Sequence, residues 1–122
     1  MKMDTYEDMF EYCKRICKIN DWILNEDKEI LKDLIKGLVD NKTRYTYQSC
    51  PCRLASGLRS IDRDIICPCD YAPPDIIEYG SCYCNLFMHL NFYENGITFV
   101  KVPERRPIEK EKVVLNHIRS KK

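Results

Sequence analysis

The sequence predicts a small, predominantly α-helical protein that forms one domain around an irregular, cysteine-rich segment. A length of 122 residues suits one domain and leaves little room for a second. Two stretches before residue 41 repeat apolar side chains at spacings of three and four, which is typical of amphipathic helices. Six of the eight cysteines then fall between residues 50 and 84, where apolar periodicity is weak.

Two N-terminal helices are the first predicted elements. One covers residues 5–18, and the other begins after Asn25, whose side chain can cap the free N–H groups of a first turn. The second helix is expected to end near Asp40 and Asn41, where the chain becomes polar. The apolar faces comprise Tyr6, Met9, Phe10, Cys13, Ile16 and Cys17 in the first helix and Ile30, Leu31, Leu34, Ile35 and Leu38 in the second.

The cysteine-rich segment, residues 50–84, is expected to be irregular. Pro51 and Pro68 stand between paired cysteines, where each fixes φ and removes a backbone donor. Two further prolines lead into a short helical turn over Asp75–Tyr79, which Gly80 is expected to stop. Metal ligation, more than hydrophobic pattern, is therefore expected to shape this segment.

The C-terminal part is predicted to contain a hairpin and a helix. Two apolar, β-prone runs are joined through Asn95–Gly96, which predicts a β-hairpin near residues 85–102. A polar connector then leads to a short helix over residues 108–118. We expect the domain to span residues 1–105 and a basic C-terminal extension to cover residues 106–122.

Charge and hydropathy exclude several classes of protein. A net charge of +1 argues against a nucleic-acid binder that works by neutralising phosphates. Residues 101–122 nevertheless carry eight basic and three acidic side chains, which form either a solvated surface or a guide for an acidic partner. No secretory signal is apparent, and no stretch approaches the roughly 20 apolar residues of a membrane span. We expect a soluble, cytoplasmic protein with no membrane partner.

The six clustered cysteines form three Cys-x-Cys doublets, at Cys50–Cys52, Cys67–Cys69 and Cys82–Cys84. Cysteines in a cytosolic protein indicate metal or redox chemistry before structural disulfides. One zinc ion or one iron–sulfur cluster takes about four thiolates, which leaves two cysteines over. Two is the number that one redox-active disulfide needs.

The geometry of a Cys-x-Cys doublet is compatible with a division of the six cysteines into cluster ligands and a redox-active pair. In an extended Cys-x-Cys the two side chains face opposite ways, so one sulfur can bind a cluster while the other lies beside it. Two other interpretations remain open at this point: a [4Fe–4S] electron-relay protein without disulfide reductase activity, and a zinc-stabilised binding module.

The doublets resemble those of the catalytic subunit of the ferredoxin–thioredoxin reductase family, which has two CPC doublets followed by a CHC. Here they stand as CPC, CPC and CYC, and the likeness extends through IKGLVDNKTRYTYQSCPCR and CYCNLF to cover about residues 5–105. The resemblance implies a fold organised around a [4Fe–4S] cluster with four cysteine ligands: Cys50, Cys67, Cys69 and Cys82. It also implies a redox-active disulfide between Cys52 and Cys84.

The resemblance further implies an enzyme and its partners. Ferredoxin would deliver electrons one at a time, and the acceptor would be the disulfide of a thioredoxin or a glutaredoxin-like protein. Cys52 would attack that disulfide, and Cys84 would be the sulfur that faces the cluster. Arg53, Arg59 and Arg63 are either solvated or favour the acidic donor. The plant-type enzyme has a small variable subunit, and the sequence leaves open whether this chain has one.

Two features depart from the family pattern or stand outside it. Tyr83 replaces the histidine of CHC, and a tyrosine, with an ordinary pKa of about 10, mainly donates a hydrogen bond. His89 can take over a proton role only if the fold turns it back towards the doublets. Cys13 and Cys17 are expected to be buried, apolar thiols; a peripheral ligand or a regulatory disulfide is the alternative.

Overall fold

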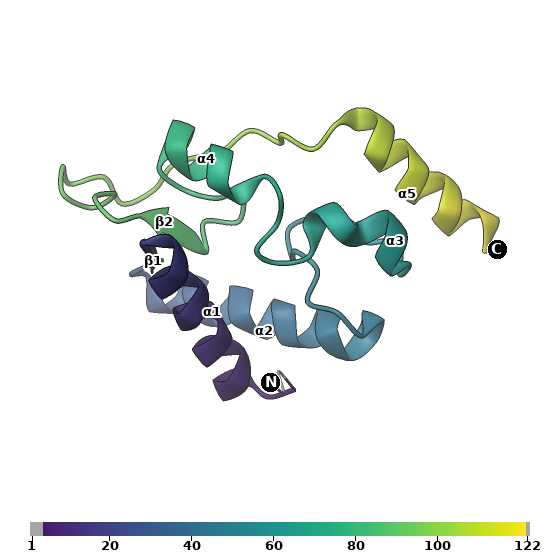
Figure 1. The fold of residues 1–122 in the computed structure, drawn as a ribbon, viewed down its shortest axis with the longest axis horizontal. Helices are drawn as coiled ribbons and strands as arrows, with labels where there is room; N and C mark the ends of the chain where they lie inside the picture. Colours follow the sequence, from purple (N-terminus) through teal and green to yellow (C-terminus); the bar gives the residue numbers. More distant parts are fainter. Residues whose placement is uncertain (1–3, 122) are drawn as a thin grey trace.

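The computed structural model describes residues 4–121, which form a small, mostly helical protein with one two-stranded sheet (Figure 1). In chain order the elements are α1 (Tyr6–Asn20), β1 (Trp22–Leu24), α2 (Lys28–Tyr45), α3 (Arg59–Asp62), the 3-10 helix η1 (Arg63–Ile65), α4 (Ala72–Tyr79), β2 (Phe87–His89) and α5 (Ile108–Ser120). Helices α1 and α2 pack together on one side, whereas α5 extends outwards next to α3. The predicted helical class is confirmed.

Both N-terminal helices are present, but the second is capped by a different residue. Asp27, not Asn25, caps α2 by accepting hydrogen bonds from the backbone N–H groups of Glu29 and Ile30. Asn25 is buried instead, and its amide donates to the Asn85 carbonyl at 2.8 Å. A contact with a distant part of the chain therefore takes Asn25 away from the helix.

Helix α2 also continues past its predicted end to Tyr45. Asn41 therefore lies within the helix, and its side chain donates to the Ser49 carbonyl at 3.0 Å. This bond ties the end of α2 to the chain that enters the first cysteine doublet.

The hydrophobic core joins the two N-terminal helices to α4 and β2. Its fully buried members include Met9, Ile35, Leu38 and Phe87. Cys13 and Cys17 also lie in this core, as expected for apolar thiols. Burial raises the pKa of Cys13 to about 12, so this thiol keeps its proton at neutral pH.

The predicted β-hairpin over residues 85–102 is wrong. Strand β2 pairs antiparallel with β1, so that Trp22 faces His89, and residues 97–101 form no strand. The pairing with β1 lets β2 bury Phe87 against the core, whereas Phe99 is left exposed. The turn at Gly96 does form, with φ at +78°, but the chain after it does not pair back onto β2.

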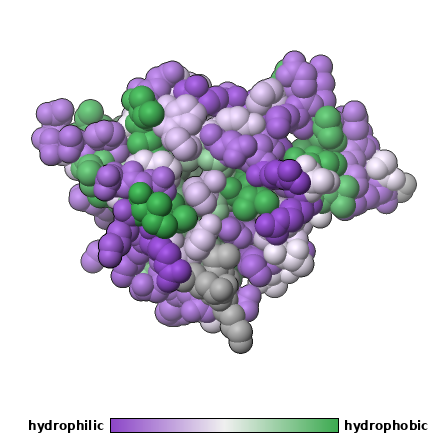
Figure 2. All heavy atoms as spheres, in the orientation of Figure 1, coloured by the Kyte–Doolittle hydropathy of each residue, from purple (hydrophilic) through white to green (hydrophobic). Residues whose placement is uncertain are grey.

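Two predicted short helices are confirmed. Helix α4 has prolines in its first turn and ends at Gly80, whose φ of +84° is readily adopted only by glycine. Helix α5 covers the predicted range and carries exposed apolar side chains such as Leu115. On the face shown in Figure 2, apolar residues form separate patches between hydrophilic ones. No helix within residues 4–121 has the length and apolarity needed to cross a bilayer.

Candidate active site around the cysteine doublets

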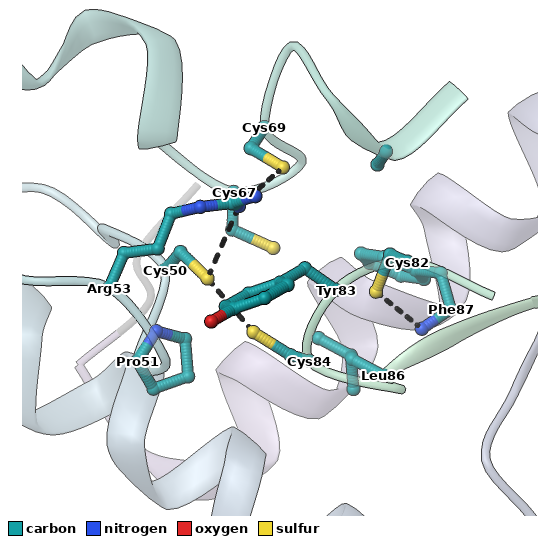
Figure 3. A pocket seen from close by; sticks show the side chains of 11 residues that line it. Cys50, Pro51, Arg53, Cys67, Cys69, Cys82, Tyr83, Cys84, Leu86 and Phe87 are labelled. Carbon is teal, nitrogen blue, oxygen red and sulfur yellow. Dashed lines mark hydrogen bonds between the residues drawn. The ribbon is translucent and has the colours of Figure 1, made fainter. Parts of the chain in front are cut away.

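The three doublets meet at one cavity (Figure 3). Arg53, Tyr83 and apolar side chains form part of its wall, and its thiol lining comes from Cys50, Cys67, Cys69, Cys82 and Cys84. The Cys52 side chain lies outside this cavity and borders a neighbouring groove. The structure thus gathers all six cysteines of residues 50–84 in one region.

Backbone pairing brings the first two doublets together. Ser49 and Ile66 form an antiparallel bridge, and on either side of it the Cys50 N–H donates to the Ile65 carbonyl at 2.7 Å. The Cys67 N–H donates to the Gln48 carbonyl at 2.9 Å. The start of the CPC at Cys50 is therefore held beside the start of the CPC at Cys67.

The third doublet is fixed to β2. The Cys82 N–H donates to the Phe87 carbonyl at 2.9 Å, and the Phe87 N–H donates back to the Cys82 sulfur at 3.3 Å. Asn85 makes the turn between them with φ at +63°, a conformation that asparagine tolerates better than most residues. The sheet therefore positions Cys82 at the cavity.

In each of the two outer doublets, one sulfur is buried and the other is more accessible. Cys50 and Cys82 are buried, whereas Cys52 is exposed and Cys84 is half-buried. The Cys84 sulfur lies 2.8 Å from the Cys50 sulfur, and all the cysteines carry free thiols. Hydrogen bonds from the Cys50 and Cys84 thiols lower the pKa of Cys52, which favours its thiolate.

Burial opposes ionisation of the deeper thiols. It raises the pKa of Cys82 to about 11 and that of Cys67 well above its ordinary value. Neutral thiols are poor metal ligands, so a cation that binds here must displace their protons. Within residues 4–121, no three His, Cys, Asp or Glu side chains converge as the ligands of one metal ion would. Five thiols instead line one cavity.

Arg53 is a site residue that sequence reasoning placed at the surface. Its side chain is only 2% exposed, and its Nη2 lies 2.6 Å from Glu104 Oε1. Its Nη1 points at the Cys69 sulfur at 3.3 Å (Figure 3). A buried, paired arginine offers no free charge to a docking partner, whereas Arg59 and Arg63 are exposed.

Tyr83 lines the cavity, and His89 does not. The Tyr83 ring stacks on the Arg53 guanidinium, with 4.5 Å from the guanidinium carbon to the ring centroid. His89 is exposed on β2, and its Nδ1 accepts from the Asn91 N–H at 3.1 Å. The fold therefore does not turn His89 back towards the doublets.

Three consecutive residues each form an ion pair with a residue of the cysteine segment. Glu104 pairs with Arg53, Arg105 pairs with Asp75, and Arg106 pairs with Asp64. We call residues 104–106 the strap. The sequence predicts only a polar connector there, and its one signal is a charged triplet between two prolines.

A comparison with protein-family models identifies a match that covers most of the chain. The model described as ferredoxin thioredoxin reductase catalytic beta chain matches residues 1–116. No curated protein matches the chain. The match confirms the resemblance that the three cysteine doublets indicate.

Proposed function

The chain belongs to the ferredoxin thioredoxin reductase catalytic beta chain family, and on that premise we propose that it reduces protein disulfides with electrons from a ferredoxin. The observation that carries this proposal is the meeting of three doublets at one cavity, with the Cys52 thiol exposed beside it. The acceptor is the disulfide of a thioredoxin or a glutaredoxin-like protein.

We assign the cofactor as a [4Fe–4S] cluster held by four buried thiolates: Cys50, Cys67, Cys69 and Cys82. Support comes from the donor set, because four thiolates are the usual ligands of such a cluster, and from the apolar wall that shields them from water. When bound, the cluster supplies one-electron chemistry next to the remaining pair of cysteines.

Cys52 and Cys84 carry the disulfide exchange in this scheme. The Cys52 thiolate attacks one sulfur of the target disulfide, whose other sulfur leaves as a thiolate. The Cys84 thiolate then attacks the Cys52 sulfur and releases the reduced target, so that the oxidation remains as a Cys52–Cys84 disulfide. Two electrons from ferredoxin, delivered singly, and two protons restore the dithiol.

The surroundings of Cys52 suit a protein substrate. Cys52 borders a groove of about 270 Å³ whose lining includes Leu54 and, from α5, Glu111 and Leu115. Leu54 and Leu115 are both exposed. A target disulfide can therefore reach Cys52 from solvent without entering the cavity.

Replacing Cys52 by serine tests the proposal. Anaerobically purified Cys52→Ser protein is expected to keep the visible absorption of an iron–sulfur cluster and to lose reduction of a thioredoxin disulfide by reduced ferredoxin. A Cys17→Ala variant, which changes a thiol in the core of α1, serves as the control and is expected to keep both properties.

Three outcomes would contradict the proposal. A Cys52→Ser variant that still reduces the disulfide removes Cys52 from the reaction and favours another nucleophile. A colourless wild-type protein with stoichiometric zinc makes the chain a zinc-stabilised module. A wild-type protein that is brown but has no reductase activity identifies the chain as an electron relay.

A further inference from the structure

The Arg53 guanidinium is a buried cation that points at two cavity thiols. Its Nη1 lies 3.3 Å from the Cys69 sulfur and 3.9 Å from the Cys50 sulfur. Hydrogen bonds from an ionised donor are stronger than neutral ones, and burial strengthens them further. Arg53 is thus placed to act on the charge of these sulfurs.

Three neighbours hold the guanidinium in this orientation. Tyr71 and Tyr83 both stack on it, at 5.1 and 4.5 Å from the guanidinium carbon to the ring centroids. Arginine stacks well on aromatic rings because its guanidinium is planar and weakly hydrated. The Glu104 carboxylate binds the opposite edge of the guanidinium, where Arg53 Nε lies 2.8 Å from Glu104 Oε2. Nη1 is left to face the sulfurs.

The neighbours are themselves fixed by the strap. The Tyr71 hydroxyl donates to Asp64 Oδ2 at 2.7 Å, and Asp64 accepts from Arg106 Nε at 2.8 Å. The Arg106 N–H donates to Glu104 Oε1 at 2.9 Å. The strap therefore sets both the carboxylate and one aromatic ring that position Arg53.

We propose that Arg53 is a positioning residue for the sulfur centre: a fixed cation that donates to Cys69 and Cys50 and whose charge Glu104 balances. Tyr83 contributes its ring to this arrangement and not its hydroxyl. The inference rests on the proposed function, because it treats these two sulfurs as cluster ligands.

The sign of the electrostatic effect follows from Coulomb's law. One-electron reduction adds negative charge at the sulfurs and irons, so a nearby cation stabilises the reduced form and raises the reduction potential. Loss of the Arg53 charge leaves Glu104 unbalanced and lowers the potential. Loss of the Glu104 charge leaves Arg53 unbalanced and raises it.

The test is the reduction potential of the cluster in anaerobically purified protein, measured by spectroelectrochemistry. We expect Arg53→Gln to lower the potential by the equivalent of at least a tenfold change in the one-electron equilibrium constant, about 59 mV, and Glu104→Gln to raise it. Tyr83→Phe keeps the stacked ring and is expected to leave the potential unchanged. Arg63→Gln, which neutralises an exposed arginine of the cysteine segment, is the matched control.

Opposite shifts support the proposal, because a purely structural role would not reverse sign between the two variants. Shifts in the same direction, or shifts no larger than that of Arg63→Gln, overturn it. If Arg53→Gln does not retain the cluster, Glu104→Gln decides alone: a raised potential supports the role of Arg53, and an unchanged or lowered one overturns it. A wild-type protein without a cluster spectrum overturns the proposed function, and this inference with it.

Discussion

The N-terminal helix pair and the cysteine segment are held together by different forces. Helices α1 and α2 meet through apolar side chains such as Met9 and Ile35, which the helical repeat brings onto one face. The cysteine segment is held by buried charged groups, of which the Arg106–Asp64 pair is one. Such a pair joins residues far apart in the chain, whereas a helical face is built from near neighbours. The helices are therefore specified locally, and the site depends on distant contacts.

Removal of one charge from a buried pair tests this difference most strongly. Asp64→Asn leaves the Arg106 guanidinium buried without its counter-ion, and both side chains are almost fully buried. Breaking such a pair destabilises a protein by roughly 3–5 kcal/mol. Urea unfolding at neutral pH should show a loss of this size. The control, Asp70→Ala, changes an exposed aspartate in the same segment and should stay within about 0.5 kcal/mol. An equally small loss for Asp64→Asn would show that the pair does not hold the segment.

A pH titration of stability sharpens the comparison. Burial alone would raise the pKa of Asp64, but hydrogen bonds from Arg106 and Tyr71 outweigh it and lower the pKa. A carboxyl whose pKa is lower in the folded state than in the unfolded state stabilises the folded protein at pH values above its unfolded-state pKa of about 3.9. That stability is lost as the pH falls through the folded-state pKa. Wild-type protein should therefore lose part of its unfolding free energy below about pH 4.

The Asp64→Asn variant lacks this particular carboxyl, so its stability should fall less steeply over the same acid range. Parallel curves for the two proteins would mean that Asp64 does not contribute to the acid transition. The difference between the two curves isolates the contribution of Asp64, because the other charge pairs of the segment titrate in both proteins.

The smallest expected effect lies in the helix pair. Asp27→Ala removes the side chain that accepts from the Glu29 and Ile30 N–H groups, and loss of such a cap costs about 1 kcal/mol. Urea unfolding of the apoprotein measures it. The exposed neighbour Glu26 provides the control, as Glu26→Ala should be nearly neutral. A loss as large as that of Asp64→Asn would mean that local capping matters to this fold as much as the distant pairs.

Sequence reasoning succeeded where structure follows from local pattern. Apolar spacing predicted α1 and α2, and the proline and glycine positions predicted α4. It failed where a partner comes from far along the chain: β2 pairs with β1, and Asn25 bonds to Asn85. Helix α3, at four residues, is too short for a periodic signal.

At the candidate site, too, local sequence pattern predicted some features and missed those that depend on distant residues. The Cys-x-Cys spacing was enough to predict that the six cysteines gather, because the doublets carry their own pattern. Nothing in that pattern indicates that Arg53 is buried, since its carboxylate partner lies 51 residues away. The role of Tyr83 was equally hidden, because a ring that stacks on a guanidinium is recognised only when the two are seen together.

The strap also sets an order of events during synthesis. Glu104 and Arg106 leave the ribosome after every cysteine of the three doublets, since the chain is made from its N-terminus. Until they emerge, Arg53 and Asp64 have no counter-ions from this segment. The site can therefore reach its final geometry only after residues 104–106 have emerged.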